Sequence, residues 1–157
     1  MMEAGQSDYE HTGVIIVDHG SRLEASNHMF EQFVTGFRQT VSFRTVEPAH
    51  MELAEPSIAT AFDRCVNKGA RRIVVCPYFL LPGKHWQQDI PEITRKAAEK
   101  YPGVPFLIAA PIGLHPHMID IVKSTIDHRL ALDRLENQKV EELKSRKKSR
   151  MDNEHST

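Results

Sequence analysis

Two histidines follow short apolar runs of the chain and could belong to one reactive site. His19 comes just after the run at residues 13–17, and His85 comes just after the run at residues 72–81. If both runs are parallel strands of one sheet, both imidazoles lie at its carboxyl edge, where open α/β sheets bind ligands. The spacing therefore predicts a metal or proton-transfer site at this edge.

Glu52 stands midway in sequence between the two histidines. The three positions end, or nearly end, three successive strands of the expected pattern. Two imidazoles and a carboxylate suit a borderline divalent ion such as Fe²⁺, Co²⁺, Ni²⁺ or Zn²⁺, with positions left open for a second ligand. A neutral imidazole can also accept a proton near neutral pH. On spacing alone, a hydrogen-bonded structural role for each histidine remains the alternative.

The pattern of apolar residues predicts the elements that carry these side chains. Short apolar runs predict strands at residues 13–17, 45–53, 72–81 and 106–110, and 3.6-residue spacing predicts helices at about 27–37, 57–68, 86–97 and 119–130. Pro48 favours an edge position or a bulge for the second strand. The order βαβαβαβα predicts an α/β fold with a four-stranded parallel sheet, right-handed crossovers and flanking helices.

Composition narrows the class of protein. The chain has 157 residues, 40% of them hydrophobic, and a net charge of −1. We therefore expect one ordinary core and neither a nucleic acid nor a membrane as partner. Cys65 and Cys76 lack metal-site spacing, which favours buried free thiols, a reducing compartment and a cytoplasmic location, or a plastid if a transit peptide has been removed.

The ends of the chain differ from its middle. Residues 1–12 are polar and are expected to form a disordered N-terminal segment. Residues 13–130 form the expected folded domain, and residues 131–157 are expected to be a charged helical extension followed by a disordered tail. A four-stranded sheet has exposed edges, which favours dimerisation.

Three motifs, taken together, resemble a known family. They are Val-Asp-His-Gly-Ser-Arg at residues 17–22, Met-Glu-Leu-Ala-Glu-Pro-Ser at 51–57 and Pro-Tyr-Phe-Leu-Leu-Pro-Gly-Lys-His-Trp-Gln-Gln-Asp-Ile-Pro at 77–91. Their order and separation are similar to those of the short class II chelatases of the CbiX and SirB type, over about residues 13–130. The resemblance implies a chelatase-like three-layer half-unit that forms a homodimer.

The resemblance also implies an activity. Such enzymes insert cobalt, or in relatives iron or nickel, into sirohydrochlorin with release of two protons, for cobalamin or siroheme biosynthesis. His19 and His85 match the catalytic and metal-binding pair, and Glu52 matches the third residue of the metal site. The expected metal substrate is Co²⁺, with Fe²⁺ or Ni²⁺ as alternatives, and no tightly bound cofactor is expected.

Polar residues beside the two histidines could hold the carboxylates of such a substrate. Ser21, Arg22 and Lys84 are the candidates, and solvated loop residues are the alternative for each. The chain departs from the family at Asp18, where a glycine or another small residue is common. Asp18 could orient the His19 ring or cap the next helix. The C-terminal tail lacks cysteine, so we expect no iron-sulfur cluster.

Other classes use related residues. A non-catalytic carrier of divalent metal could use the same His19, Glu52 and His85 without a tetrapyrrole. A histidine phosphatase is disfavoured because Asp18 would repel a phosphoryl group. A flavodoxin-like module is disfavoured because residues 18–22 lack the Ser, Thr and Gly run that cradles phosphate.

Overall fold

The computed structural model describes residues 5–154, which fall into two compact units that divide between His115 and Pro116. The first unit is built on a four-stranded, wholly parallel sheet in the order β2-β1-β3-β4. The strands are β1 (Thr12–Asp18), β2 (Thr45–His50), β3 (Arg72–Pro77) and β4 (Phe106–Ile108). The predicted parallel sheet is confirmed, and β2 lies at the predicted edge.

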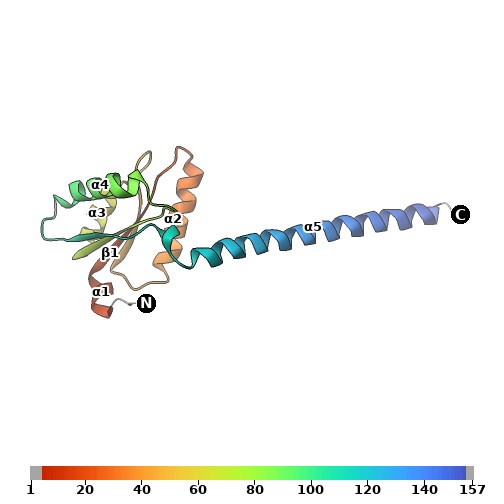
Figure 1. Cartoon of the computed structure of the whole chain (residues 1–157), viewed down its shortest axis with the longest axis horizontal. Coiled ribbons are helices and arrows are strands. Elements are labelled where there is room, and N and C mark those ends of the chain that lie inside the picture. Colours follow the sequence, from red (N-terminus) through yellow and green to blue (C-terminus); the bar gives the residue numbers. More distant parts are fainter. Residues whose placement is uncertain (1–4, 155–157) are drawn as a thin grey trace. The chain divides into compact units, whose positions relative to one another are not determined.

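Helices cover the two faces of this sheet (Figure 1). In β1, Ile15 and Val17 point to one face, where they pack with α3 (Ile58–Asn67) and α4 (Ile90–Ala98). Val14 and Ile16 point to the other face and pack with α2 (Glu24–Arg38). This two-residue alternation in a strand buried on both faces explains why its sequence is continuously apolar.

Several helix ends follow local chemistry that the sequence contains. The Ser57 side chain accepts a hydrogen bond from the Thr60 backbone and caps α3, and Gly69, with φ of 88°, follows its last turn. By contrast, α2 begins at Glu24, three residues before the predicted start at about residue 27. The Asn27 amide instead binds the backbone of Ser21, which takes it away from capping.

Three predicted strands are too long, and the last of them, β4, ends at Ile108 rather than at residue 110. β2 ends at His50 rather than residue 53, where Leu53 adopts a left-handed φ of 68° that cannot continue a strand. β3 ends at Pro77 rather than residue 81, because β1, its neighbour, ends at Asp18 and offers no further pairing. The apolar side chains of Leu80 and Leu81 are therefore exposed.

The N-terminal segment differs from the expected disorder. Residues 6–11 form a short helix, α1 (Gln6–His11), and Thr12 already belongs to β1. The Tyr9 ring lies 4.7 Å from that of Phe43, and the Asp8 carboxylate pairs with Arg72 at 3.2 Å. These contacts explain the order of a polar segment. Residues 1–4, the rest of the predicted disordered stretch, lie outside the described residues.

The second unit consists of one helix, α5 (Met118–Glu154). It includes the helix predicted at 119–130 and continues through most of the charged extension, while residues 155–157 lie outside the description. Its apolar positions Ile119, Val122, Ile126 and Leu130 recur at helical spacing, and each is more than half exposed. Among residues 5–154, no helix combines the length and the apolar character needed to cross a membrane.

A buried carboxylate links β2 to α3. Glu47 is only 3% exposed, accepts hydrogen bonds from Thr45 and Lys68, and lies 3.8 Å from the Arg38 guanidinium. Burial by itself raises the pKa of Glu47, but the hydrogen bonds from Lys68 and Thr45 and the charges of Lys68 and Arg38 outweigh it, so this pKa lies below the usual 4.5. The ionised carboxylate thus stabilises the fold.

Replacing Lys68 by methionine should lower the free energy of unfolding by about 1–3 kcal/mol at pH 7, because the buried charge loses a hydrogen-bond donor. Because the pKa of Glu47 is lower in the folded state, its ionised form stabilises the fold at pH values above the usual pKa. This contribution is lost as the pH falls through the folded-state pKa. The difference from the wild type, measured by urea unfolding, should therefore shrink between pH 5 and pH 3.

The matched control is Lys100→Met, which removes an exposed partner of Asp63. Exposed ion pairs contribute about 0–1 kcal/mol, so this variant should unfold close to the wild type. Equal effects of the two substitutions on the free energy of unfolding would show that the buried Glu47–Lys68 pair stabilises the fold no more than an exposed ion pair does.

Candidate active site

His19 lies in a tight turn at the carboxyl end of β1. The Asp18 carboxylate accepts a hydrogen bond from the Gly20 backbone at 3.0 Å, which closes the turn over His19. Gly20 has φ of 86°, a conformation that favours glycine. The turn leaves the His19 side chain 44% exposed, so its imidazole can reach a ligand.

Glu52 is brought to His19 by backbone pairing that continues beyond the two strands. The Met51 amide donates to the Asp18 carbonyl at 2.8 Å, and the Glu52 amide donates to the His19 carbonyl at 3.1 Å. With the two loops joined, Glu52 Oε1 lies 2.8 Å from His19 Nε2. The sequence therefore correctly places these two residues side by side.

His85 approaches from a third segment, the π-helical turn η1 (His85–Asp89) that leads into α4. Its ring centroid lies 5.1 Å from that of His19, with the two rings nearly perpendicular at 72°. Pro91 lacks the N–H that would continue α-helical hydrogen bonding back into this segment, which favours the wider turn. His19 thus lies next to Glu52 and His85, the two other residues of the predicted metal site.

Each site imidazole has its own carboxylate partner. His19 Nε2 contacts Glu52, and His85 Nδ1 lies 2.6 Å from Asp89 Oδ2. Such pairs orient an imidazole and can exchange protons with a ligand. Within residues 5–154, however, no group of three His, Cys, Asp or Glu side chains is arranged to hold a metal ion as it stands.

The predicted substrate-binding residues differ in what they contact. The Ser21 hydroxyl accepts a hydrogen bond from the Leu23 amide at 3.0 Å, so it shapes its own loop. Arg22 and Lys84 are exposed, and neither has an ion pair with any residue in the range 5–154. The two cations beside the histidines are therefore free to meet an anionic ligand, whereas Ser21 is already engaged.

Two partners were missed by the sequence analysis. Asp89 is four residues after His85, and this i,i+4 spacing within a helix could have identified it. Among the described contacts, Asp18 makes no hydrogen bond to the His19 ring, and it does not cap α2, whose N-cap is Leu23. It binds the Gly20 amide and His50 Nδ1, at 3.0 and 2.6 Å. The pairing with His50 follows from the β1–β2 register, which places the two residues opposite each other.

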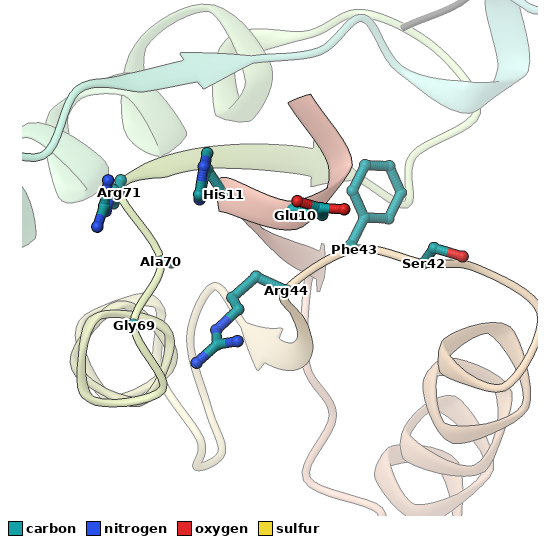
Figure 2. Close-up of a pocket in the computed structure, with 8 residues that line it drawn as sticks. All are labelled: Glu10, His11, Ser42, Phe43, Arg44, Gly69, Ala70 and Arg71. Carbon is teal, nitrogen blue, oxygen red and sulfur yellow. The ribbon is translucent and has the colours of Figure 1, made fainter. Parts of the chain in front are cut away.

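A pocket of about 710 Å³ lies at the opposite edge of the sheet, where strands begin. Figure 2 shows the residues that line it, which are Glu10, His11, Ser42, Phe43, Arg44, Gly69, Ala70 and Arg71. None of them belongs to the predicted site. Because the paired imidazoles and carboxylates gather at the carboxyl edge, we place the candidate active site there.

The two cysteines lie outside this site. Both are free thiols, as predicted. Burial raises the pKa of Cys65 to about 12 and also raises the pKa of Cys76. The thiols are therefore protonated at neutral pH and unsuited to nucleophilic or metal-binding chemistry.

Gly20→Ala should lower the free energy of unfolding by more than about 2 kcal/mol. A left-handed backbone alone costs an L-residue about 1–2 kcal/mol. In addition, a Cβ at Gly20 would lie 2.1 Å from the Glu52 carbonyl oxygen, so the two site loops would have to separate. Thermal and urea unfolding measure the effect.

The control is Gly36→Ala in α2, where an added Cβ meets no atom within 4 Å. This substitution should raise the free energy of unfolding by about 0.5–1 kcal/mol. A Gly20→Ala protein as stable as the wild type would show that the turn tolerates another geometry.

Comparison with known proteins identifies relatives of this chain. The CbiX family model matches residues 13–129. The chain is 53% identical over 119 residues to the chloroplastic sirohydrochlorin ferrochelatase of Arabidopsis thaliana, covering 76% of this chain and 53% of that protein. It is 35% identical over 114 residues to the sirohydrochlorin cobaltochelatase of Priestia megaterium, covering 72% of this chain and 37% of that protein.

Solved structures show the same fold. The sirohydrochlorin chelatase SirB of Bacillus subtilis subspecies spizizenii, in complex with cobalt, superposes with a TM-score of 0.70 and 33% identity, over 74% of this chain and 50% of that one. A putative cobalamin biosynthesis CbiX protein of Marinobacter aquaeolei superposes with a TM-score of 0.67 and 28% identity, over 76% of this chain and 98% of that one.

These matches differ in length. The chain spans about half or less of the Arabidopsis and Priestia relatives, but it covers nearly all of the Marinobacter protein. The family model itself matches most of the chain and includes all three motifs and every predicted site residue. The parallel sheet, the paired histidines at its carboxyl edge and this match lead to one conclusion: the chain belongs to the CbiX family.

Proposed function

We propose that this protein is a sirohydrochlorin chelatase that inserts a divalent metal into the macrocycle with release of two protons. The observation that carries the proposal is the meeting of His19, Glu52 and His85 at the carboxyl edge of the sheet. Family membership and the activities named for the Arabidopsis and Priestia relatives support it.

The spacing of the His19 and Glu52 donors is close to what a shared ion requires. Two donors that bind one ion at about 2.1 Å each stand about 3.0–3.4 Å apart. His19 Nε2 and Glu52 Oε1 are 2.8 Å apart, so a small opening admits an ion between them. We infer that these two residues receive the metal and that Glu52 offsets part of its charge.

His85 is placed to act on the same centre. Its Nδ1 faces the Asp89 carboxylate, which leaves Nε2 as the nitrogen that can bind the metal or accept a proton. During insertion, two pyrrole protons must leave as the metal loses water. We propose that His85 completes the metal site with His19 and that both imidazoles help to remove those protons.

The substrate itself is rich in carboxylates. Arg22 follows His19 by three residues, Lys84 directly precedes His85, and both side chains are exposed. We propose that these two cations hold substrate carboxylates. Ser21 contributes mainly by shaping the loop, since its hydroxyl already binds the Leu23 amide.

The identity of the metal substrate needs a separate argument. A site of two imidazoles and one carboxylate does not separate iron from cobalt or nickel. The sequence analysis ranked Co²⁺ first, whereas the 53% identical Arabidopsis relative is named a ferrochelatase. We therefore propose Fe²⁺ ahead of Co²⁺, with siroheme rather than cobalamin as the product pathway. The same relative supports a plastid location over a cytoplasmic one.

We also propose that the protein acts as a homodimer. On the α2 face of the sheet, Val74 and Cys76 of β3 are only partly buried and Leu107 of β4 is 57% exposed. Their neighbours Ile73 and Val75 are wholly buried against the other face. A second copy that covered this apolar half-face would complete its burial.

The activity is tested by mixing anaerobic protein with sirohydrochlorin and Fe²⁺, Co²⁺ or Ni²⁺ and following the absorbance of the macrocycle. We expect insertion faster than in protein-free mixtures. His19→Ala and His85→Ala should each reduce the rate at least about 100-fold, because loss of one imidazole removes both a ligand and a proton acceptor. Glu52→Gln should weaken metal binding more than it lowers the maximal rate.

His28→Ala is the control, since His28 is exposed on α2, where its ring hydrogen-bonds Gln32. It should insert metal at the wild-type rate. If the wild type binds metal tightly but never outpaces the protein-free reaction, the carrier function replaces the chelatase.

The dimer is tested by analytical ultracentrifugation. The wild type should sediment with twice the mass of one chain, and Leu107→Lys should give monomers because it places a charge in the covered half-face. Met29→Lys changes a residue of α2 that is 70% exposed and should leave the dimer intact. A monomeric wild type with full activity would contradict the proposal.

A further inference from the structure

His50 is a wholly buried histidine beside the candidate active site. It is the last residue of β2 and is 0% exposed. Its Nδ1 lies 2.6 Å from Asp18 Oδ1, whereas its Nε2 has no hydrogen-bond partner among residues 5–154 and lies 3.7 Å from Glu31 Oε1. Burying a histidine with one nitrogen unsatisfied is costly, so this placement calls for an explanation.

The Asp18 carboxylate connects this buried residue to the site. A carboxylate only accepts hydrogen bonds, so His50 Nδ1 carries the proton and donates it to Asp18. The same oxygen, Oδ1, also accepts from the Gly20 amide at 3.0 Å. His19 lies between Asp18 and Gly20 in the chain. The His50–Asp18 contact therefore fixes one side of the turn that carries His19.

The surroundings of His50 make it a rigid anchor. Its amide donates to the Pro56 carbonyl at 2.7 Å, and its ring lies 5.6 Å from that of Phe30. A Cβ on Gly20 would lie 3.1 Å from His50 Cβ, so the turn rests directly on this residue. His50 is thus held by β2, by the loop before α3 and by α2, while Asp18 is only partly buried.

We propose that His50 is a positioning residue, which acts through Asp18 to hold the His19 imidazole toward Glu52 and His85. It does so without contact with the metal or the macrocycle. The inference deepens the proposed chelatase function, on which its activity measurements rest. The family resemblance did not point to it, since the chain departs from the common family pattern at Asp18.

Two substitutions separate positioning from mere packing. In asparagine the amide nitrogen is two bonds beyond Cβ, as Nδ1 is in histidine, so His50→Asn keeps a donor for Asp18. Leucine has the branching of asparagine but no donor, so His50→Leu fills the same space and leaves Asp18 unpaired. A packing role predicts equal effects of the two substitutions, whereas a positioning role predicts rescue by asparagine.

The first readout is independent of catalysis. In metal-free, ¹⁵N-histidine-labelled protein, NMR reports the tautomer and the ring shifts of His19. We expect altered His19 ring signals in His50→Leu and near wild-type signals in His50→Asn. Titration with Co²⁺, followed by visible absorption, should show binding weakened about 10–100-fold in His50→Leu and within about threefold of wild type in His50→Asn.

The second readout is the insertion reaction. His50→Leu should lower kcat about 10–100-fold with a KM for sirohydrochlorin within about threefold of the wild type, since the residues that hold the macrocycle are untouched. Thr94→Val is the control for loss of a buried polar group, because the Thr94 hydroxyl is wholly buried and has no hydrogen-bond partner within residues 5–154. It should leave both the His19 signals and kcat unchanged.

Unchanged His19 ring signals in a folded His50→Leu protein would overturn the proposal, as would equal effects of leucine and asparagine. If His50→Leu does not fold, Asp18→Asn and Asp18→Ala make the same comparison, because asparagine keeps the oxygen that accepts from His50 and Gly20. A wild type that fails to insert metal would refute the proposed function alone, since the NMR comparison of His19 still decides the role of His50.

Discussion

The site depends on the pairing of β1 with β2 beyond the point where both strands end. Amides of Met51 and Glu52 continue to bond to Asp18 and His19, so two irregular loops keep the spacing of a sheet. This pairing places Glu52 beside His19 without any help from a regular element. Gly20 has to be a glycine for the same reason, because any larger residue would push the paired loops apart.

Much of this arrangement could be predicted from sequence because it follows from the order of strands. Parallel strands joined by helices must place their carboxyl ends at one edge, so the residues after β1, β2 and β3 had to meet there. The end of α3 before Gly69 likewise follows from a local signal, because this glycine adopts a left-handed φ of 88°. What was missed depends on contacts across the chain. The role of Asp18 required the β1–β2 register, and α1 is ordered by contacts with Phe43 and Arg72.

The lengths of elements were predicted less well than their existence. An apolar run continues into residues 78–81, but a strand needs a neighbour to bond to, and β1 has already ended. The fourth predicted helix is much longer than its apolar pattern, since α5 continues through charged residues that favour helix and form their own pairs, such as Lys123 with Asp127 and Glu141 with Lys144. Sequence patterns state which surface could be buried but not what covers it.

The functional side chains and their supports differ in burial, and this difference suits a reaction that exchanges a metal for protons. His19 and His85 lie on a turn and a π-helical segment, where they are close to half exposed and can reach a ligand. The groups that hold them are less accessible to solvent, because the side chains of Asp89 and Asp18 are 33% and 22% exposed and that of His50 is wholly buried. In the proposed function these imidazoles bind a metal and then release it, so they cannot themselves be locked in a core. Their orientation has to come from the buried residues that contact their loops. His50, at the end of β2, therefore matters to the site as much as the exposed imidazoles do.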